Sequence, residues 1–363
     1  MTSLKRIALI IPGGLGTGKN NMGVPVLEQI VELLATRLEV TVFQLYQTNK
    51  GYEANGFELL GFKSGNRLIQ YLKFFQSFYK ANRSKKFAAI HGFWIWPCGF
   101  LAVVLGKFFK IKSIVSVLGG DAASIPEIGY GHLRNFFSRS MILWAIEKAD
   151  EANALTRYLE SNLNQAGLKR KLQIIPWGVD QTLFQFGIKP LQNPIQFLHI
   201  ANLHPVKDQE TLLRAFQVIQ STHPAHLTIV GEGRDEQNVR GLIDQLKLQR
   251  VITLRNQLPY ADLPRVYQSA DILLHTSITE GQSEVVTEAM SCGTLVAGTE
   301  VGLLHDLPQG CIAVPVGDYL GLAKTVITTL QETEKMNRIR DHAHRWTTDH
   351  SIGWTVDRLT ELY

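Results

Sequence analysis

Short runs of β-branched and apolar residues alternate with segments of helical periodicity along almost the whole chain. In one helical segment, for example, Val26, Leu27, Ile30, Val31 and Leu34 recur at helical spacing just after Pro25, a residue that favours the first turn of a helix. Strands that alternate with helices predict parallel sheets whose two faces are both covered by helices. We therefore expect an α/β fold.

The alternation occurs in two sets of six strands. We expect the first set at Arg6–Ile11, Val40–Leu45, Ala88–His91, Ser113–Val117, Glu151–Ala154 and Gln173–Ile175. We expect the second set at Gln196–Ile200, His226–Val230, Val251–Leu254, Ile272–His275, Leu295–Gly298 and Cys311–Val314. A stretch without periodicity separates the sets and predicts domains at 1–182 and 183–335, with a helical segment at 336–363 that packs back toward the first domain. The 363 residues suit two domains of roughly 100–200 residues.

Composition and cysteine usage favour a reduced, intracellular protein. Apolar residues make up 45% of the chain and charged residues 19%, as in globular proteins. The 3 cysteines are odd in number and lack the spacing of metal ligands. The apolar run Ile7–Ile11 is too short for a secretory signal. We expect a cytoplasmic location and no metal site.

One stretch, 87–106, resembles a membrane span because it contains no Asp, Glu, Lys or Arg. About 20 apolar residues suffice to cross a bilayer. However, His91, Gly92 and Pro97 interrupt this stretch. We expect a buried strand, a Gly/Pro loop and a helix instead.

The charge is unevenly distributed. The stretch 59–120 contains no acidic residue, but it holds many lysines, arginines and aromatic residues. Such a segment suits peripheral contact with an anionic membrane. It equally suits a solvated helix face whose aromatic residues belong to the core. Nothing in it matches a nucleic-acid motif, so we expect no nucleic-acid partner.

The segment 277–293 carries the most informative motif. It follows the expected strand Ile272–His275 and leads into a helix, with Glu280 in the loop and Glu288 inside the helix. Gly281 lets the backbone approach a ligand, and N–H groups at the start of a helix suit a phosphate. Carboxylates can accept hydrogen bonds from sugar or ribose hydroxyls. The alternative is a loop with solvated acids.

Glu280 and Glu288, together with Gly281, Met290 and Gly293, resemble the Glu-x7-Glu signature of family 4 retaining glycosyltransferases. The segments 175–180, 203–208 and 229–233 are similar to further family motifs in the expected order, and the resemblance covers most of the chain from about residue 110 onward. It implies the GT-B fold, with two Rossmann-like domains facing a central cleft. It also implies a nucleotide-sugar donor, retention of anomeric configuration, and no metal or cofactor.

The same resemblance implies roles for individual residues. Lys207 would contact the donor diphosphate, Glu280 the transferred sugar and Glu288 the ribose. Asn202 stands where the family usually has an arginine, which weakens the phosphate clamp unless Asn202 or another base substitutes. The remaining donor-binding candidates are Gly231, Gly233, Gly281, Ser283, Glu284 and Val285.

The first domain matches the family less well. A glycine loop after the first strand makes Gly14 and Gly16 donor-binding candidates. The loop also resembles a nucleoside-triphosphate loop ending at Lys19, but Asn20 replaces the required Ser or Thr.

Leu118 occupies a position where many family members have a catalytic-site histidine. Asp121 and His91 remain as catalytic candidates in this domain. Asp121 could instead cap the next helix, and a lone histidine such as His91 is often structural.

The sequence as a whole predicts a retaining hexosyltransferase. It would move a sugar from a UDP- or GDP-sugar to a hydroxyl of a glycan or lipid-linked acceptor, in polysaccharide or glycolipid biosynthesis. One alternative is a nucleotide-sugar epimerase or hydrolase on the same fold. Another is a non-catalytic nucleotide-sugar-binding subunit, which the residues Asn202 and Leu118 favour.

Overall fold

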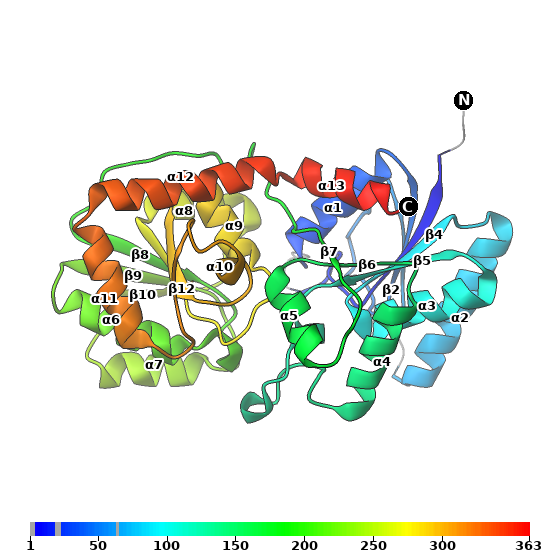
Figure 1. Ribbon diagram of the computed structural model, residues 1–363, viewed down its shortest axis with the longest axis horizontal. Coiled ribbons are helices and arrows are strands. Elements are labelled where there is room, and N and C mark those ends of the chain that lie inside the picture. Colours follow the sequence, from blue (N-terminus) through cyan, green and yellow to red (C-terminus); the bar gives the residue numbers. More distant parts are fainter. Residues whose placement is uncertain (1–3, 19–22, 63–64) are drawn as a thin grey trace. The chain divides into compact units, whose positions relative to one another are not determined.

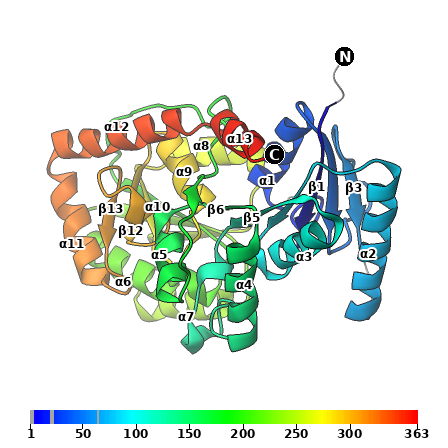
Figure 2. The ribbon, with the colours of Figure 1, turned by 45° about the vertical axis from the view of Figure 1, so that its right-hand side comes forward.

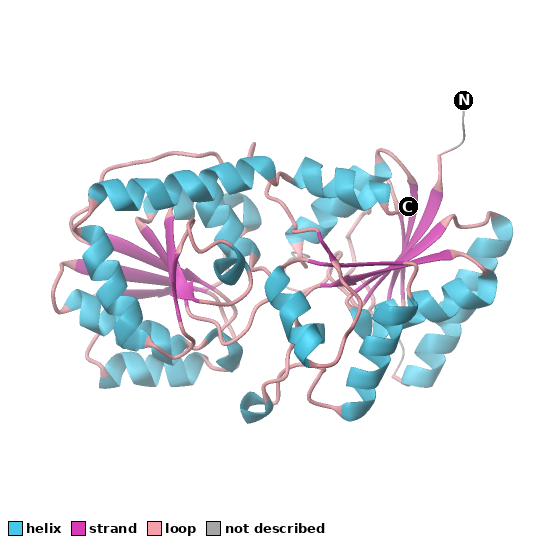
Figure 3. Cartoon of the chain, in the orientation of Figure 1, coloured by secondary structure: helices cyan, strands magenta, loops and turns pink. Residues whose placement is uncertain are grey.

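The computed structural model describes residues 4–18, 23–62 and 65–363 and divides them into two compact units (Figure 1). The first unit comprises the chain up to Trp177 together with Ile352–Tyr363, and the second comprises Gly178–Ser351. Each unit is a parallel sheet covered by helices on both faces (Figure 3). The predicted α/β class with two Rossmann-like domains is confirmed.

In the described part of the first unit, strands pair in the order β3-β2-β1-β4-β5-β6-β7. Their bounds are β1 Arg6–Ile11, β2 Glu39–Gln44, β3 Glu58–Gly61, β4 Ala89–Phe93, β5 Lys112–Val117, β6 Glu151–Ala154 and β7 Gln173–Ile174. The helices are α1 Pro25–Ala35, α2 Arg67–Ser84, α3 Phe100–Phe109, α4 Phe136–Lys148, α5 Arg157–Gln165 and α13 Ile352–Glu361. Strand β3 was not predicted, because this edge strand is only half buried and shows neither a long apolar run nor clean alternation.

The central strands are buried on both faces, which explains their continuous apolar runs. Ile7, Leu9 and Ile11 of β1 pack in one core with α1 and α13. Ala8 and Ile10 pack on the other side with α2 and α3. Helices α2, α3 and α4 cover this second face (Figures 1 and 2).

In the second unit the strand order is β10-β9-β8-β11-β12-β13, and every pair is parallel. The strands are β8 Ile195–Ile200, β9 Ala225–Val230, β10 Ile252–Arg255, β11 Ile272–His275, β12 Leu295–Thr299 and β13 Ile312–Val314. The helices are α6 Gln209–Gln220, α7 Glu236–Gln245, α8 Leu263–Ser269, α9 Glu284–Ser291, α10 Leu303–Asp306, α11 Tyr319–Leu330 and α12 Thr333–Asp349. The chain moves outward in opposite directions from β8 and β11, so these neighbours form a topological switch point, where open parallel sheets bind ligands.

The division of the chain differs from the expected boundaries. The first unit ends at Trp177 rather than at 182, and the expected C-terminal segment 336–363 is split. Helix α12 packs against α9 in the second unit, whereas α13 packs against α1 in the first. The split follows from burial, since α13 places Val356 and Leu359 in the core of the first unit.

The stretch 87–106, which contains no Asp, Glu, Lys or Arg, forms β4, an irregular helical turn at Ile95–Gly99 and most of α3, as predicted. Among the residues described, no helix combines the length and the apolar character needed to cross a membrane.

Candidate active site

The loops that follow β8 and β11 meet at the switch point of the second unit. After β8, a short 3₁₀ turn, Pro205–Lys207, precedes α6. The Thr276 hydroxyl donates to the carbonyl oxygens of Lys207, at 3.1 Å, and Asp208, at 3.0 Å. The Ile278 N–H donates to the Val206 carbonyl at 2.8 Å. These bonds fix the base of the Lys207 side chain against the loop that carries Glu280.

Lys207 and Glu280 form an ion pair at this point. The Ser277 hydroxyl donates to Glu280 Oε1 at 2.7 Å, and His275 Nε2 lies 3.4 Å from the same oxygen. Burial alone would raise the pKa of the Glu280 carboxyl, but the Lys207 ammonium and His275 hold that pKa below its usual value. Glu280 is therefore ionised at neutral pH. The Lys207 side chain remains 22% exposed, so an anion can reach its ammonium group.

Helix α9 presents its N-terminus beside this pair. Its N-cap, Ser283, has a φ of +81° and makes no side-chain capping bond. A non-glycine residue in this conformation costs about 1–3 kcal/mol, and such strain clusters at ligand sites. The N–H groups in the first turn of a helix attract anions. Glu284 lies in the same turn, and burial raises the pKa of its carboxyl.

Glu288 lies one turn further along α9 and is buried. The Tyr267 hydroxyl donates to Glu288 Oε2 at 2.7 Å, and the Tyr260 hydroxyl bonds to the same carboxyl. Burial raises the pKa of Glu288 to about 8, although the bond from Tyr267 opposes this shift. Two tyrosines thus orient a carboxyl that is largely protonated at neutral pH.

The predicted glycines bring two loops together. A Cβ on Gly231 would lie 1.8 Å from the Ala201 carbonyl oxygen, and one on Gly233 would lie 2.1 Å from that of Leu203. Only glycine allows the loop after β9 to lie this close to the loop after β8, which carries Asn202. Asn202 is exposed, and so is the nearby Arg234.

In the first unit, the predicted glycine loop is buried. A Cβ on Gly16 would lie 2.2 Å from the Tyr52 ring, and Leu15 exchanges two hydrogen bonds of 3.0 Å with the Gln44 amide. Gly14 is likewise buried. Lys19 and Asn20 of the rejected triphosphate-loop interpretation lie outside the described residues.

His91 lies in a buried hydrogen-bond network of the first unit. Its ring is fully buried in β4. Nδ1 lies 2.8 Å from the Tyr363 hydroxyl, and Nε2 lies 2.7 Å from the Ser116 hydroxyl, which donates in turn to Asn153. Burial lowers the pKa of His91 to about 3. Both ring nitrogens are thus used inside the core, and the predicted catalytic role has no geometric support.

Asp121 is also buried, and it holds two loops together. Its Oδ2 accepts from the Ile95 N–H at 3.0 Å and from the Leu118 N–H at 3.3 Å. Burial raises its pKa to about 6, against the effect of these bonds. The structure supports a loop-positioning role for Asp121 more directly than a catalytic one.

Sequence reasoning did not single out four residues that shape the second-unit site. They are His275, Thr276, Ser277 and Tyr267. The first three follow one another from the end of β11 to the first residue of the motif segment 277–293, so their position was the available signal. Tyr267 carries no such signal, because its contact with Glu288 arises only when α8 packs on α9.

Comparison with known proteins gives the architecture its context. Residues 180–346 match the family model described as glycosyl transferases group 1. Sucrose-phosphate synthase of Thermosynechococcus elongatus superposes with a TM-score of 0.82 at 19% identity, covering 99% of this chain and 98% of that one. The chain has the GT-B fold. HepE of Anabaena, solved in complex with UDP and glucose, superposes with a TM-score of 0.74 at 17% identity over 98% of both chains.

A curated relative extends the similarity at the level of sequence. N-acetyl-alpha-D-glucosaminyl L-malate synthase of Bacillus anthracis is 26% identical over 263 residues, which are 68% of this chain and 65% of that protein. The chain thus spans slightly less than two thirds of that relative's length. The matches to the group 1 glycosyl transferase model and to this relative are the sequence-level counterpart of the shared GT-B fold.

Proposed function

We propose that the protein is a retaining glycosyltransferase that moves a hexose-type sugar from a UDP- or GDP-sugar to an acceptor hydroxyl. The observation that carries the proposal is the Lys207–Glu280 pair, set beside the α9 N-terminus at the switch point of the second unit. A nucleotide sugar needs a cation and N–H donors for its phosphates and an acceptor for its sugar hydroxyls. This site offers all three where the loops after β8 and β11 meet.

The proposed chemistry depends on the leaving group. As the sugar departs, negative charge grows on the diphosphate, and fixed donors aimed at that charge lower the barrier. Lys207 would exchange its bond to Glu280 for one to the phosphate, with the first-turn N–H groups of α9 beside it. Glu280, ionised and held by Ser277, would then accept hydrogen bonds from the transferred sugar.

The leaving phosphate would itself take the proton of the acceptor hydroxyl as the new glycosidic bond forms on the same face of the sugar. This route fits the absence of a catalytic-site histidine at Leu118 and the buried position of His91. It also needs no metal or cofactor. Glu288, oriented by Tyr267 and Tyr260, would contact the ribose.

The acceptor is proposed to be a glycan or a lipid-linked molecule, used in the cytoplasm or at the cytoplasmic membrane face. Support comes from the acid-free segment 59–120 of the first unit, which suits an anionic surface. The UDP complex of the structural neighbour HepE supports a uridine donor. The proposal includes guanosine donors as well.

A donor screen tests the proposal. Purified protein is incubated with UDP- and GDP-sugars, with and without a membrane lipid extract, and free nucleoside diphosphate is assayed. Release that requires one donor and the extract supports transfer. Donor-dependent release without any acceptor, together with free sugar, would indicate a hydrolase. Tight donor binding without release under any condition would indicate a non-catalytic subunit.

A further inference from the structure

Helix α2 exposes a stripe of apolar side chains. Leu68, Leu72, Phe75 and Tyr79 are 67%, 53%, 37% and 49% exposed. Their spacing of four, three and four residues places them along one line of the helix surface. The same helix buries Phe74 and Phe78 against the sheet, so its core-facing surface is separate from this stripe. An uninterrupted apolar line in water marks an interaction surface.

The charged residues on the exposed surface of α2 are all basic. Beside the stripe, the exposed residues of α2 include Lys73, Lys80 and Arg83 together with Ile69 and Gln76, and α2 contains no Asp or Glu. Helix α2 therefore combines an apolar stripe with cations and lacks the acidic residues that balance charge on an ordinary solvated helix. This combination is typical of helices that lie in the plane of an anionic membrane surface.

Aromatic contacts extend the stripe to the end of α3. The Tyr79 and Phe109 ring centroids lie 6.3 Å apart, and those of Phe109 and Phe108 lie 4.8 Å apart. Phe108 is 79% exposed. The apolar surface of α2 thus continues onto a second helix of the same face of the sheet.

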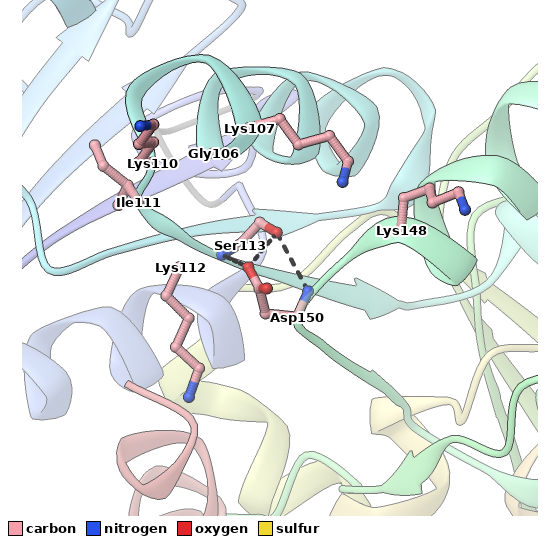
Figure 4. A pocket seen from close by; sticks show the side chains of 8 residues that line it. All are labelled: Gly106, Lys107, Lys110, Ile111, Lys112, Ser113, Lys148 and Asp150. Carbon is pink, nitrogen blue, oxygen red and sulfur yellow. Dashed lines mark hydrogen bonds between the residues drawn. The ribbon is translucent and has the colours of Figure 1, made fainter.

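A lysine-lined pocket of about 480 Å³ includes Lys107, the residue before Phe108 in the chain (Figure 4). Lys107 and Lys110 at the end of α3 and Lys148 at the end of α4 contribute its cations. The carboxylate in the pocket, Asp150, accepts from the Ser113 N–H at 2.7 Å and from its hydroxyl at 2.8 Å. Asp150 is thus engaged by Ser113, and within the described part of the chain none of these three lysines forms an ion pair.

We propose that this face docks the first unit on a bilayer of anionic phospholipid. The docking face consists of Leu68, Leu72, Phe75, Tyr79 and Phe108, with Lys107, Lys110 and Lys148. The apolar side chains enter the boundary between headgroups and acyl chains, and the lysine pocket receives headgroup phosphates. A second copy of this chain would bring the same cations together, so charge complementarity favours the lipid surface over self-association. The inference rests on the proposed function in one respect: it supplies the membrane at which a lipid-linked acceptor is used.

Vesicle co-sedimentation of the full chain tests the docking face. Wild-type protein is mixed with vesicles of phosphatidylcholine alone and with vesicles that also contain about 30 mol% phosphatidylglycerol, an anionic lipid. Binding is expected to require the anionic lipid and to weaken with salt. The Lys107→Ala/Lys110→Ala/Lys148→Ala variant is expected to bind roughly 100-fold more weakly, at about 1 kcal/mol per lysine. The Leu72→Ser/Phe75→Ser variant is expected to lose more than about tenfold, even at low salt.

Matched variants on other surfaces serve as controls. Val316→Ser/Leu320→Ser alters exposed apolar residues of the second unit, and Lys50→Ala/Lys171→Ala/Lys324→Ala removes exposed lysines elsewhere. Both controls are expected to bind vesicles like wild type. Thermal unfolding of every variant shows whether the fold is retained.

Three results would overturn the inference. The first is equal binding to neutral and anionic vesicles, and the second is unchanged vesicle binding by folded docking-face variants. The third is a wild-type protein that binds no vesicles but forms dimers in solution that the docking-face substitutions abolish. Donor binding, measured on the same variants, separates this inference from the proposed function. Donor binding without vesicle binding contradicts only the docking face, and vesicle binding without donor binding contradicts only the transferase.

Discussion

The two units of the molecule carry titratable side chains in or just after corresponding central strands, but they use them in opposite ways. In the second unit, Lys207 and Glu280 pair with each other at the surface of the switch point and stay partly exposed. In the first unit, His91 and Asp121 are sealed inside the protein. Both ring nitrogens of His91 form hydrogen bonds with residues of its own unit. A chemically suitable residue near a strand end is thus a functional candidate only when its polar atoms remain available to a ligand.

The sealed network of the first unit has a clear structural purpose. Hydrogen bonds run from Tyr363 through His91 and Ser116 to Asn153, across β4, β5 and β6. Since Tyr363 follows α13, this network fixes the segment after α13 to the sheet. Tyr363 is distant in sequence from His91 and Ser116. Its hydrogen bond helps to satisfy the buried polar groups of β4 and β5.

The largest expected effect concerns the exposed pair. Lys207→Ala and Glu280→Ala are each expected to lower kcat about 10²–10³-fold, because each removes an interaction with charge or hydroxyls at the reacting centre. Steady-state kinetics with the donor found in the screen provides the measurement. Lys324→Ala and Glu334→Ala alter exposed residues of the same unit and are expected to retain full activity. Near-normal turnover of both site variants would remove the site assignment.

The next effect should appear in stability rather than in turnover. His91→Ala leaves the Tyr363 hydroxyl without this buried partner, removes one of the two partners of Ser116 and opens a cavity, so the free energy of unfolding should fall by about 2–4 kcal/mol. Tyr363→Phe removes only the terminal bond and should cost about 1–2 kcal/mol. Urea unfolding measures both. The donor KM of each folded variant should equal that of wild type, and a large loss of kcat with unchanged stability would restore His91 as a catalytic residue.

A smaller effect follows from the raised pKa of Glu288. In the donor-free protein this carboxyl has a pKa of about 8 rather than 4.5, so it is protonated at pH 6.5 and ionised at pH 9. A carboxylate accepts ribose hydroxyls better than the neutral acid, so affinity for a UDP- or GDP-sugar should rise roughly tenfold over this interval. The free energy of unfolding should fall as pH rises from 4.5 to 8, since the unfolded chain releases this proton first. In Glu288→Gln both dependences should be absent, and a pH profile like that of wild type would exclude Glu288 as their source.

The smallest effect concerns Asn202. Introducing a cation into the loop that carries Lys207 with Asn202→Arg should lower the donor KM about three- to tenfold, because one more charge-assisted bond would reach the diphosphate. The exposed position of Asn202 leaves room for the longer side chain. Steady-state kinetics with the donor found in the screen measures this KM, with Asn238→Arg, on the exposed surface of α7, as the control. An unchanged or higher KM would show that the phosphate does not approach Asn202.

Most of the fold was accessible from sequence, since buried parallel strands leave continuous apolar runs that mark their own positions. β6 and β11 begin and end where expected, whereas the edge strand β3 was missed because it is half exposed. The motif around Glu280 was found because loop and helix are contiguous in the chain. The contact of His91 with Tyr363 could not be predicted, because Tyr363 lies at the far end of the sequence. The Tyr267–Glu288 bond was missed because it depends on how two helices pack.

The central claim is that the donor binds at the pair in the second unit and not at the buried histidine of the first. Calorimetric titration of wild type, Lys207→Ala and His91→Ala with UDP-glucose, and with GDP-mannose as the guanosine probe, tests this claim most directly. One of the two donors should bind wild type and His91→Ala alike and should bind Lys207→Ala at least about tenfold more weakly, as expected for loss of a charge-assisted contact. Unchanged binding by Lys207→Ala, combined with lost binding by a folded His91→Ala protein, would contradict the account.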